Sequence, residues 1–283
     1  MNAFPHFSRR EALLAGGAVL VAQACPAAAA SPFTSRRIAV TVRGAGPDVV
    51  LIPGLASGPF IWNQTMTLVP GYRYHLVQVR GFAGLAPDIN KQAGPLLAPL
   101  TGEIARYVQE NGLRRPAVVG HSMGGTLAMM LGLRPAPELG RVMVVDMLPE
   151  GAGMVGGTAS GMGYLADQMS QYFTGTKAGR ALFADMLARS PGGNDSDPDV
   201  VAKALTELAH TDLTPSLAHI RAPLRVVYAQ PADKETAGAL TQRFRAAYAA
   251  SRAALTPIGP SGHVVMADQP QRFAEALKGF LKA

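Results

Sequence analysis

The sequence predicts a three-layer α/β domain with a mostly parallel sheet and a helical cap. Three observations support this prediction: the composition is that of a chain with a large core, short β-branched runs alternate with helical patterns, and one long segment contains no strand. Of the 283 residues, 48% are hydrophobic and 16% are charged, so the chain must bury most of itself. This length and composition exclude a disordered chain and a small disulfide-stapled domain.

The predicted strands are near-continuous apolar runs. Strands that are buried on both faces have this composition, which is typical of parallel sheets covered by helices. Parallel neighbours need crossover connections, and helical patterns lie between the runs as that arrangement requires. The six runs are 49–52, 76–79, 117–119, 142–145, 224–228 and 254–258.

Capping residues and apolar residues at helical spacing predict three helices. We expect the first to begin with Thr101 as its cap and to end near Gly112. The other two lie towards the C-terminus. Their apolar stripes are Leu240, Phe244 and Tyr248 in one, and Phe273, Leu277, Phe280 and Leu281 in the other.

The segment at about 149–222 interrupts this alternation because it contains no convincing strand. It starts with a glycine-rich stretch and continues with helical patterns that carry aromatic and methionine residues. We expect a helical cap, inserted between strands of a domain that spans residues 31–283. Its apolar side chains could line a pocket or serve as ordinary core, and the sequence does not separate these uses.

Residues 1–30 are predicted to be a bacterial export signal. The pair Arg9-Arg10 precedes an apolar run at 12–24 that is too short to span a membrane, and the alanines at 27–30 supply a cleavage site. Paired arginines before such a run resemble the twin-arginine class, so we expect an exported protein, periplasmic or secreted, without a membrane span after cleavage. A lipid anchor on Cys25, the single cysteine, is the alternative.

The segment Gly120-His121-Ser122-Met123-Gly124 has the pattern Gly-x-Ser-x-Gly. It follows a predicted buried strand and opens a predicted helix, which places Ser122 on a sharp strand-turn-helix with its hydroxyl above the edge of the sheet. Both glycines are needed because side chains at their positions would clash in such a tight turn. Ser122 is therefore the candidate nucleophile.

A serine hydroxyl needs a base to act as a nucleophile near neutral pH. Of the six histidines, His263 lies between the last predicted strand and the C-terminal helix, at the edge of the sheet where Ser122 emerges. The third residue should be a carboxylate that follows an intervening strand and orients the imidazole. Asp233 is the first candidate, because an acid shortly before the histidine is the commoner order. Asp146 is the rival, and Glu235 is a distant third.

Two backbone N–H groups are expected to stabilise the oxyanion that develops during acyl transfer. Met123, directly after the nucleophile, should provide one, and Leu55, in the loop after the run at 49–52, should provide the other. Gly54 would allow the backbone to approach closely, although a simple Pro-Gly turn explains the same residues.

These residues resemble the α/β-hydrolase superfamily over roughly residues 37–283. The resemblance implies an α/β-hydrolase fold with a helical cap and Ser-His-Asp hydrolysis of esters or related acyl compounds. Its elements in this sequence are Pro53-Gly54-Leu55, the segment 120–125, Asp233, and Gly262-His263 followed by Asp268-Gln269-Pro270.

The sequence departs from the usual pattern of this superfamily at three places. Pro53 stands where many members have a histidine, and Gln78 stands where an aspartate often precedes the arginine at position 80. Gln230-Pro231-Ala232 displaces Asp233 from the most familiar spacing of the acid in this superfamily.

The expected function is that of a serine hydrolase, a carboxylesterase that forms an acyl-enzyme on Ser122 with a small-molecule ester. An aspartate at the same turn would form an alkyl ester, so the serine disfavours dehalogenase and epoxide-hydrolase chemistry. An acyltransferase with the same triad, or a non-catalytic binding protein on the same fold, are the alternatives. The sequence does not fix the acyl group, the alcohol or the oligomeric state.

No cofactor, metal or nucleic-acid partner is expected. The sequence contains no His-x-x-x-His pair, and no Gly-x-Gly-x-x-Gly directly follows a predicted strand. The formal net charge of +7 comes from scattered basic residues, and we interpret it as favouring solubility.

Overall fold

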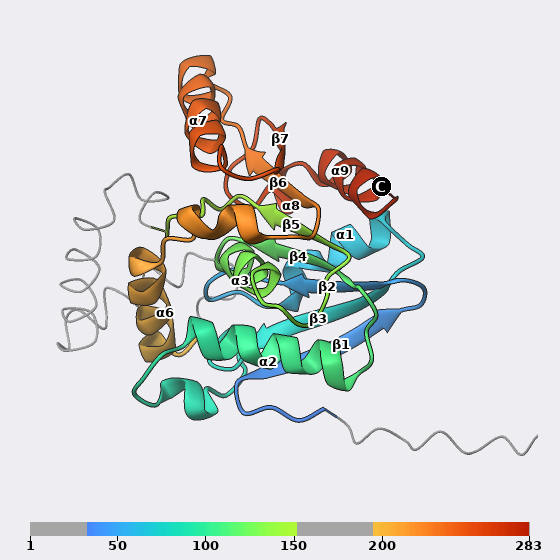
Figure 1. The fold of residues 1–283 in the computed structure, drawn as a ribbon, viewed down its shortest axis with the longest axis vertical. Helices are drawn as coiled ribbons and strands as arrows, with labels where there is room; N and C mark the ends of the chain where they lie inside the picture. Colours follow the sequence, from blue (N-terminus) through green and yellow to red (C-terminus); the bar gives the residue numbers. More distant parts are fainter. Residues whose placement is uncertain (1–32, 152–194, 283) are drawn as a thin grey trace, which may run out of the picture. The chain divides into compact units, whose positions relative to one another are not determined.

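A seven-stranded sheet with the order β1-β3-β2-β4-β5-β6-β7 forms the centre of the computed structural model, which describes residues 33–151 and 195–282 (Figure 1). All neighbouring strands are parallel except β1 and β3, which are antiparallel. The strands are β1 (Ile38–Gly44), β2 (Asp48–Ile52), β3 (Arg73–Val79), β4 (Ala117–His121), β5 (Arg141–Val145), β6 (Leu224–Ala229) and β7 (Ala254–Ile258).

The predicted fold class is confirmed, and each of the six predicted runs lies within or coincides with a strand. The added strand, β1, pairs at the edge of the sheet, with Ile38 opposite Val79. The residues of β1 from Thr41 to Gly44 are exposed, which explains why this strand lacks the continuous apolar pattern of the others.

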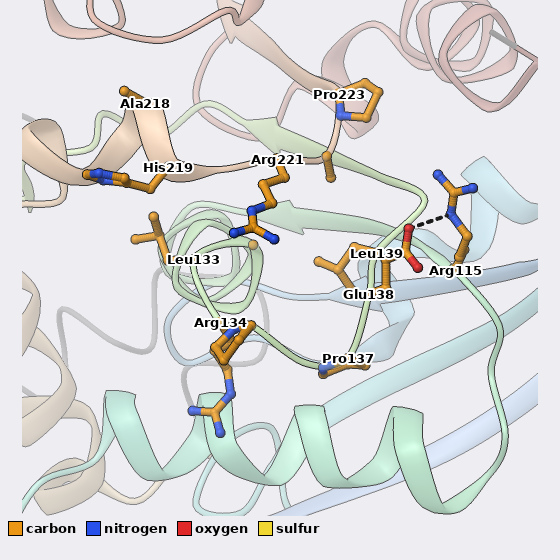
Figure 2. A pocket seen from close by; sticks show the side chains of 13 residues that line it. Arg115, Leu133, Arg134, Pro137, Glu138, Leu139, Ala218, His219, Arg221 and Pro223 are labelled. Carbon is orange, nitrogen blue, oxygen red and sulfur yellow. Dashed lines mark ion pairs between the residues drawn. The ribbon is translucent and has the colours of Figure 1, made fainter.

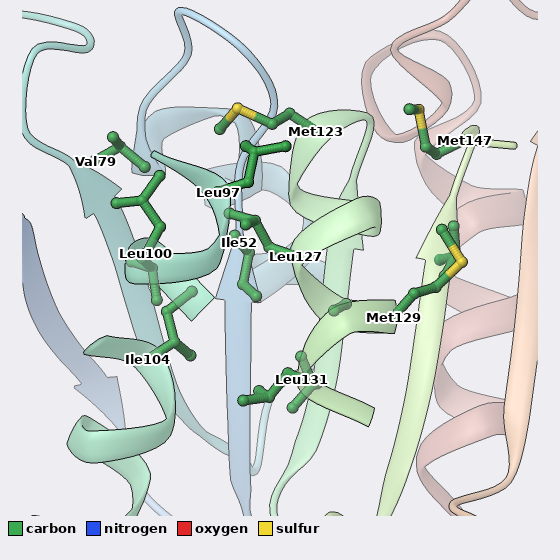
Figure 3. Packing of buried hydrophobic residues seen from close by; sticks show 14 of the residues in the cluster. Ile52, Val79, Leu97, Leu100, Ile104, Met123, Leu127, Met129, Leu131 and Met147 are labelled. Carbon is green, nitrogen blue, oxygen red and sulfur yellow. The ribbon is translucent and has the colours of Figure 1, made fainter. Parts of the chain in front are cut away.

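Helices cover both faces of the sheet and close one hydrophobic cluster on each. On one face, buried residues of α2, α3, α6 and α7 pack together, and Figure 3 shows Leu100 and Ile104 beside Ile52 and Leu127. On the other face, Trp62 packs with residues of α8 and α9. The helices are η1 (Pro59–Trp62), α1 (Asn63–Leu68), η2 (Asp88–Lys91), α2 (Leu97–Glu110), α3 (Met123–Gly132), α6 (Pro198–His210), η5 (Thr214–His219), α7 (Lys234–Ala247), α8 (Val265–Asp268) and α9 (Pro270–Lys282).

The predicted start of α2 is wrong, whereas its predicted end is confirmed. The helix begins at Leu97, so Thr101 lies inside it, and the Thr101 hydroxyl donates to the Leu97 carbonyl at 2.9 Å. At the other end Gly112 has φ +62°, the left-handed conformation that glycine adopts readily. The amides of Gly112 and Leu113 donate back to the carbonyls of Gln109 and Val108, which is the Schellman arrangement.

The predicted cap lies only partly within the described residues, since 152–194 are outside them. The described remainder is mainly helical, with α6 and η5. The amide of Asp197 donates to the Gly81 carbonyl at 2.7 Å, and the Gly84 amide donates to the Asp195 carbonyl at 2.8 Å. These bonds hold the start of α6 against the loop that follows β3.

The predicted export signal at residues 1–30 lies outside the described residues. The chain divides into two compact units, residues 1–31 and residues 32–283, and the described elements all belong to the second.

Candidate active site

Ser122 occupies the turn between β4 and α3, with φ 53° and ψ −124°. The two glycines of the motif are required by close backbone approach, as the sequence predicts. A Cβ atom on Gly120 would lie 2.0 Å from the Gly124 carbonyl oxygen, and one on Gly124 would lie 2.3 Å from that of Ile52. Real Cβ atoms do not approach so closely, so this turn tolerates only glycine at these two positions.

Backbone hydrogen bonds fix the turn at Ser122. Its amide donates to the Val145 carbonyl on β5 at 2.9 Å, and its carbonyl accepts from the amides of Gly125 and Thr126 at 2.7 and 3.2 Å. The first turn of α3 therefore begins directly at the serine. A helix N-terminus presents free N–H groups and a partial positive charge, which favour a developing anion nearby.

The carboxylate that contacts His263 is Asp146. Its Oδ2 lies 2.7 Å from His263 Nδ1, and its Oδ1 accepts a hydrogen bond from the Ala229 amide at 2.9 Å. Asp146 is 5% exposed and follows β5 directly. Both carboxylate oxygens are therefore occupied, as a buried charge requires.

The prediction that Asp233 orients His263 is wrong in this geometry. Asp233 is the N-cap of α7, and its side chain accepts a hydrogen bond from the Thr236 amide at 2.7 Å. The Thr236 side chain, and then the amides of Thr236 and Glu235, lower the pKa of this exposed carboxyl. Asp233 therefore stabilises the start of a helix, which is the ordinary use of aspartate at an N-cap.

His263 lies on a loop that is fixed by hydrogen bonds to Asp268. The Asp268 Oδ2 accepts from the Gly262 amide at 2.8 Å and from the Ser261 hydroxyl at 3.3 Å. The His263 side chain is 45% exposed, so the imidazole combines a buried partner at Nδ1 with a surface open to solvent. Within the described residues no hydrogen bond joins the Ser122 hydroxyl to His263, and such bonds often form only when substrate is bound.

The loop after β2 lies against the nucleophile turn. A Cβ atom on Gly54 would lie 3.1 Å from the Cβ of Ser122 and 3.1 Å from His121 Nδ1. Glycine at this position therefore has a packing reason, and Leu55 is the next residue of the same loop. The two predicted oxyanion donors belong to segments that meet at Ser122.

His121, the last residue of β4, is buried beneath this site. Burial, and then the charge of His263, lower the pKa of His121 from 6.5 to about 4, so its ring is neutral at pH 7. Its Nε2 lies 2.9 Å from the backbone carbonyl oxygen of His263, and the two imidazole rings have centroids 4.7 Å apart.

Comparison with known families agrees with this arrangement. A model described as the alpha/beta hydrolase family matches residues 49–276. The chain belongs to the alpha/beta hydrolase family. The match includes the turn at Ser122, the carboxylate of Asp146 and the loop of His263, together with most of the sheet.

Esterases are among the relatives of this α/β hydrolase. The pimeloyl-[acyl-carrier protein] methyl ester esterase of Vibrio vulnificus is 23% identical over 254 residues, which cover 84% of this chain and 95% of that protein. An esterase from Exiguobacterium antarcticum superposes with a TM-score of 0.67 at 20% identity, covering 87% of this chain and 96% of that one. A hydrolase from Pseudomonas aeruginosa gives 0.65 at 22% identity, covering 87% and 94%. At these identities the solved structures show the shared fold.

A cavity of about 510 Å³ lies at the other edge of the α/β-hydrolase sheet (Figure 2). It is lined by Arg115, Leu139 and Pro223, which precede β4, β5 and β6, and by the end of α3. Ser122 and Asp146 follow their strands, so this cavity does not adjoin the candidate site. Figure 2 shows Arg115 paired with Glu138, at a distance of 3.2 Å.

Two further properties concern only the part of this α/β hydrolase that the structure describes. Its residues include no group of three or more His, Cys, Asp or Glu side chains arranged to hold a metal ion. Its helices include none with the length and apolar character needed to span a membrane.

From the sequence of this α/β hydrolase, Asp146 is only the second candidate for the acid, and no role is predicted for the Asp268 side chain. Two signals favour Asp146: it follows the apolar run of β5 without any intervening residue, whereas Asp233 stands four residues past β6. Asp233 also precedes a helical pattern by one residue, which is the position of an N-cap. The role of Asp268 depends on the path of the loop at 260–264 and has no local signal.

Proposed function

We propose that this α/β hydrolase is a serine hydrolase that cleaves carboxylic esters through an acyl-enzyme on Ser122. One observation carries the proposal: the contact of 2.7 Å between Asp146 Oδ2 and His263 Nδ1, at the sheet edge where Ser122 follows β4. A carboxylate at Nδ1 selects the tautomer in which that nitrogen bears the proton. The Nε2 atom of His263 is then free to accept a proton.

Acylation uses these groups in order. The Ser122 Oγ attacks the ester carbonyl carbon, its proton passes to His263 Nε2, and the carbonyl oxygen becomes an oxyanion. The amides of Met123 and Leu55 are proposed to donate to that oxyanion. When the tetrahedral species collapses, the bond to the alcohol oxygen breaks and His263 returns the proton to the departing alcohol.

Deacylation repeats this sequence with water. His263 accepts a proton from a water molecule as the water oxygen attacks the acyl carbon, and the proton then returns to Ser122 Oγ as the acid leaves. The 45% exposure of the His263 side chain supports access of water to the base.

The proposed substrates are esters with a small alcohol group. The support comes from the relatives, several of which are named as methyl ester esterases. A panel of p-nitrophenyl and methyl esters that vary in acyl length would measure the preference directly. We expect hydrolysis with kcat/KM that depends on acyl length.

The decisive experiment combines this panel with a fluorophosphonate probe, which labels activated serines. We expect the probe to label the protein at a single site, and Ser122→Ala to lose both labelling and hydrolysis. Removing a triad residue typically lowers turnover by about 10⁴ to 10⁶. Ser216→Ala, in η5, is the matched control and should keep both properties.

Three results would contradict the proposal: no hydrolysis of any ester by the wild type, labelling that persists in Ser122→Ala, or hydrolysis that persists in that variant. Melting curves of both variants exclude unfolding as the cause of a loss. Product analysis in the presence of an added alcohol separates hydrolysis from acyl transfer, because only transfer yields a new ester.

We also propose that the protein is exported by the twin-arginine route. The support is the order of Arg9-Arg10, the apolar run at 12–24 and the alanines at 27–30.

A further inference from the structure

His121 links the strand of the nucleophile to the backbone of the base. It is the last residue of β4, directly before Ser122, and its Nε2 lies 2.9 Å from the carbonyl oxygen of His263. A carbonyl oxygen only accepts hydrogen bonds. The Nε2 atom of His121 must therefore bear a proton and donate it to this oxygen.

The ring of His121 has little freedom to do anything else. The residue is 5% exposed, and its Nδ1 has no hydrogen-bond partner among the described residues. A Cβ atom on Gly54 would lie 3.1 Å from that Nδ1, so the loop after β2 packs against it. A buried histidine with one unpaired nitrogen lowers the stability of the fold. A smaller apolar residue would avoid this loss, so the presence of histidine at position 121 needs an explanation.

Three contacts hold His263, and each acts on a different part of the residue or its loop. Asp146 holds the imidazole at Nδ1, and Asp268 holds the amide of the preceding Gly262. His121 holds the carbonyl of His263 itself. Of these three, His121 is the one that is covalently next to Ser122.

We propose that His121 is a positioning residue, whose Nε2–H fixes the backbone of His263 so that its imidazole stays aligned with Ser122. This inference rests on the proposed function and adds to it a residue that has no place in the proton transfers. Misplacement of a catalytic group by about 1 Å can lower a rate by about 10²-fold. A direct bond between the two segments limits that displacement.

The uncharged state of His121 suits this role. During acylation His263 becomes an imidazolium, and the centroid of the His121 ring lies 4.7 Å from that of His263. A lysine or arginine would also donate a hydrogen bond, but its charge would oppose the imidazolium at this distance. Burial lowers the pKa of His121 to about 4. The ring is therefore neutral at pH 7 and donates its hydrogen bond without that repulsion.

The test uses two variants of similar length that differ in the donor. His121→Gln places an amide N–H near the position of Nε2, whereas His121→Met has no donor there. We expect His121→Met to lower kcat by about 10- to 100-fold with KM changed by less than about threefold. His121→Gln should recover most of the loss. The rate of fluorophosphonate labelling of Ser122 should follow kcat.

Two outcomes would overturn the proposal: His121→Met with wild-type kcat, or equal losses in the two variants that have wild-type melting temperatures. A measurement without any ester keeps the inference separate from the proposed function. In ¹⁵N spectra of the wild-type imidazoles at pH 7, His121 should be neutral with its proton on Nε2. A proton on Nδ1 instead would overturn the inference even if the protein hydrolyses esters. Absence of hydrolysis with the expected tautomer would contradict the proposed function alone.

Discussion

Ser122 and Asp146 share an unusual backbone conformation, with φ 53° and φ 50°. Each directly follows one of two neighbouring strands, and each amide donates to a carbonyl on the next strand, Ser122 to Val145 and Asp146 to Val227. Positive φ is unfavourable for residues with a Cβ atom, and it persists where surrounding structure imposes it. The sheet itself, rather than a separate loop, therefore places both side chains at its carboxyl edge.

The two aspartates should differ in their effects on turnover and on stability. Asp146→Asn keeps the shape of the side chain but favours the wrong tautomer of His263, so turnover should fall by about 10⁴-fold while the fold is retained. Asp233→Ala removes only the N-cap of α7. It should lower the free energy of unfolding by about 0.5–2 kcal/mol and leave kcat unchanged.

The measurements are turnover on one ester and urea unfolding, for both variants. A large loss of turnover in Asp233→Ala at wild-type stability would show that the acid was assigned to the wrong strand. Similar turnover of Asp146→Asn and wild type would show that the contact with His263 has no catalytic role.

His121 should make the stability of the folded protein depend on pH. Its pKa is about 4 in the folded protein against 6.5 for an unperturbed histidine, because burial and the charge of His263 outweigh the opposing effects of the His263 carbonyl and Asp146. The unfolded chain therefore binds more protons than the folded protein between these two pH values. The contribution of His121 to the free energy of unfolding is therefore fully present above pH 6.5 and is lost as the pH falls towards 4.

At about 1.4 kcal/mol per pKa unit, His121 should reduce the free energy of unfolding by about 2 kcal/mol between pH 7 and pH 5. His121→Gln cannot take up this proton, so its stability should depend less on pH by the same amount. Urea unfolding of both proteins at pH 7 and pH 5 measures the difference. Parallel losses in the two proteins would mean that His121 does not titrate as stated.

The motif at 120–125 and the order of the chain were sufficient to predict the strand-turn-helix at Ser122 and to place His263 on the loop between β7 and α8. They were not sufficient to choose the acid, because Asp146 and Asp233 both follow strands that end at the same edge of the sheet. The choice depends on which carboxylate comes within hydrogen-bond distance of one nitrogen. That distance results from the packing of the loop at 260–264, which no local pattern encodes.

Among the elements, α2 shows how a helix can begin without a local cap. Its first amides, of Leu96 and Leu97, donate to the two carboxylate oxygens of Glu207 on α6, at 2.6 and 2.8 Å. A negative charge at a helix N-terminus is also favourable to the helix dipole. This cap is 110 residues away in the sequence, so the sequence pattern favoured the nearer Thr101 instead.

We expect Glu207→Ala to lower the free energy of unfolding by about 1–3 kcal/mol, because it leaves two partly buried amides without their charged partner. Glu275→Ala, on an exposed position of α9, is the matched control and should change stability by less than about 0.5 kcal/mol. Thermal and urea unfolding give both values. Equal effects of the two substitutions would show that Glu207 does not cap α2.

Residues 32–283 form a compact unit. Its first described residue, Phe33, packs edge-on against Tyr107 with centroids 4.9 Å apart, and the guanidinium of Arg106 lies over its ring. The folded unit therefore uses the chain from Phe33 onwards.

A protein that starts at residue 32 should accordingly have the melting temperature of the fully processed protein.

Export should depend on the preceding segment, because the twin-arginine route recognises the paired arginines. Arg9→Lys combined with Arg10→Lys should leave uncleaved protein in the cytoplasm. Fractionation and immunoblotting of the producing cells measure this. Normal export of the double variant would show that another route operates, and a lower melting temperature of the shortened protein would place part of the fold before residue 32.

The left-handed conformations at Ser122 and Asp146 have a consequence for how such a chain evolves. Glycine would relieve an unfavourable conformation of about 1–3 kcal/mol at each position, against a total stability of about 5–15 kcal/mol for a typical domain. At Asp146 this gain is offset, because glycine would leave the buried Ala229 amide without its carboxylate partner. A gene copy released from selection for catalysis would therefore gain stability by drifting to glycine at 122. In inactive descendants of this chain, that change should appear before the core of the sheet changes.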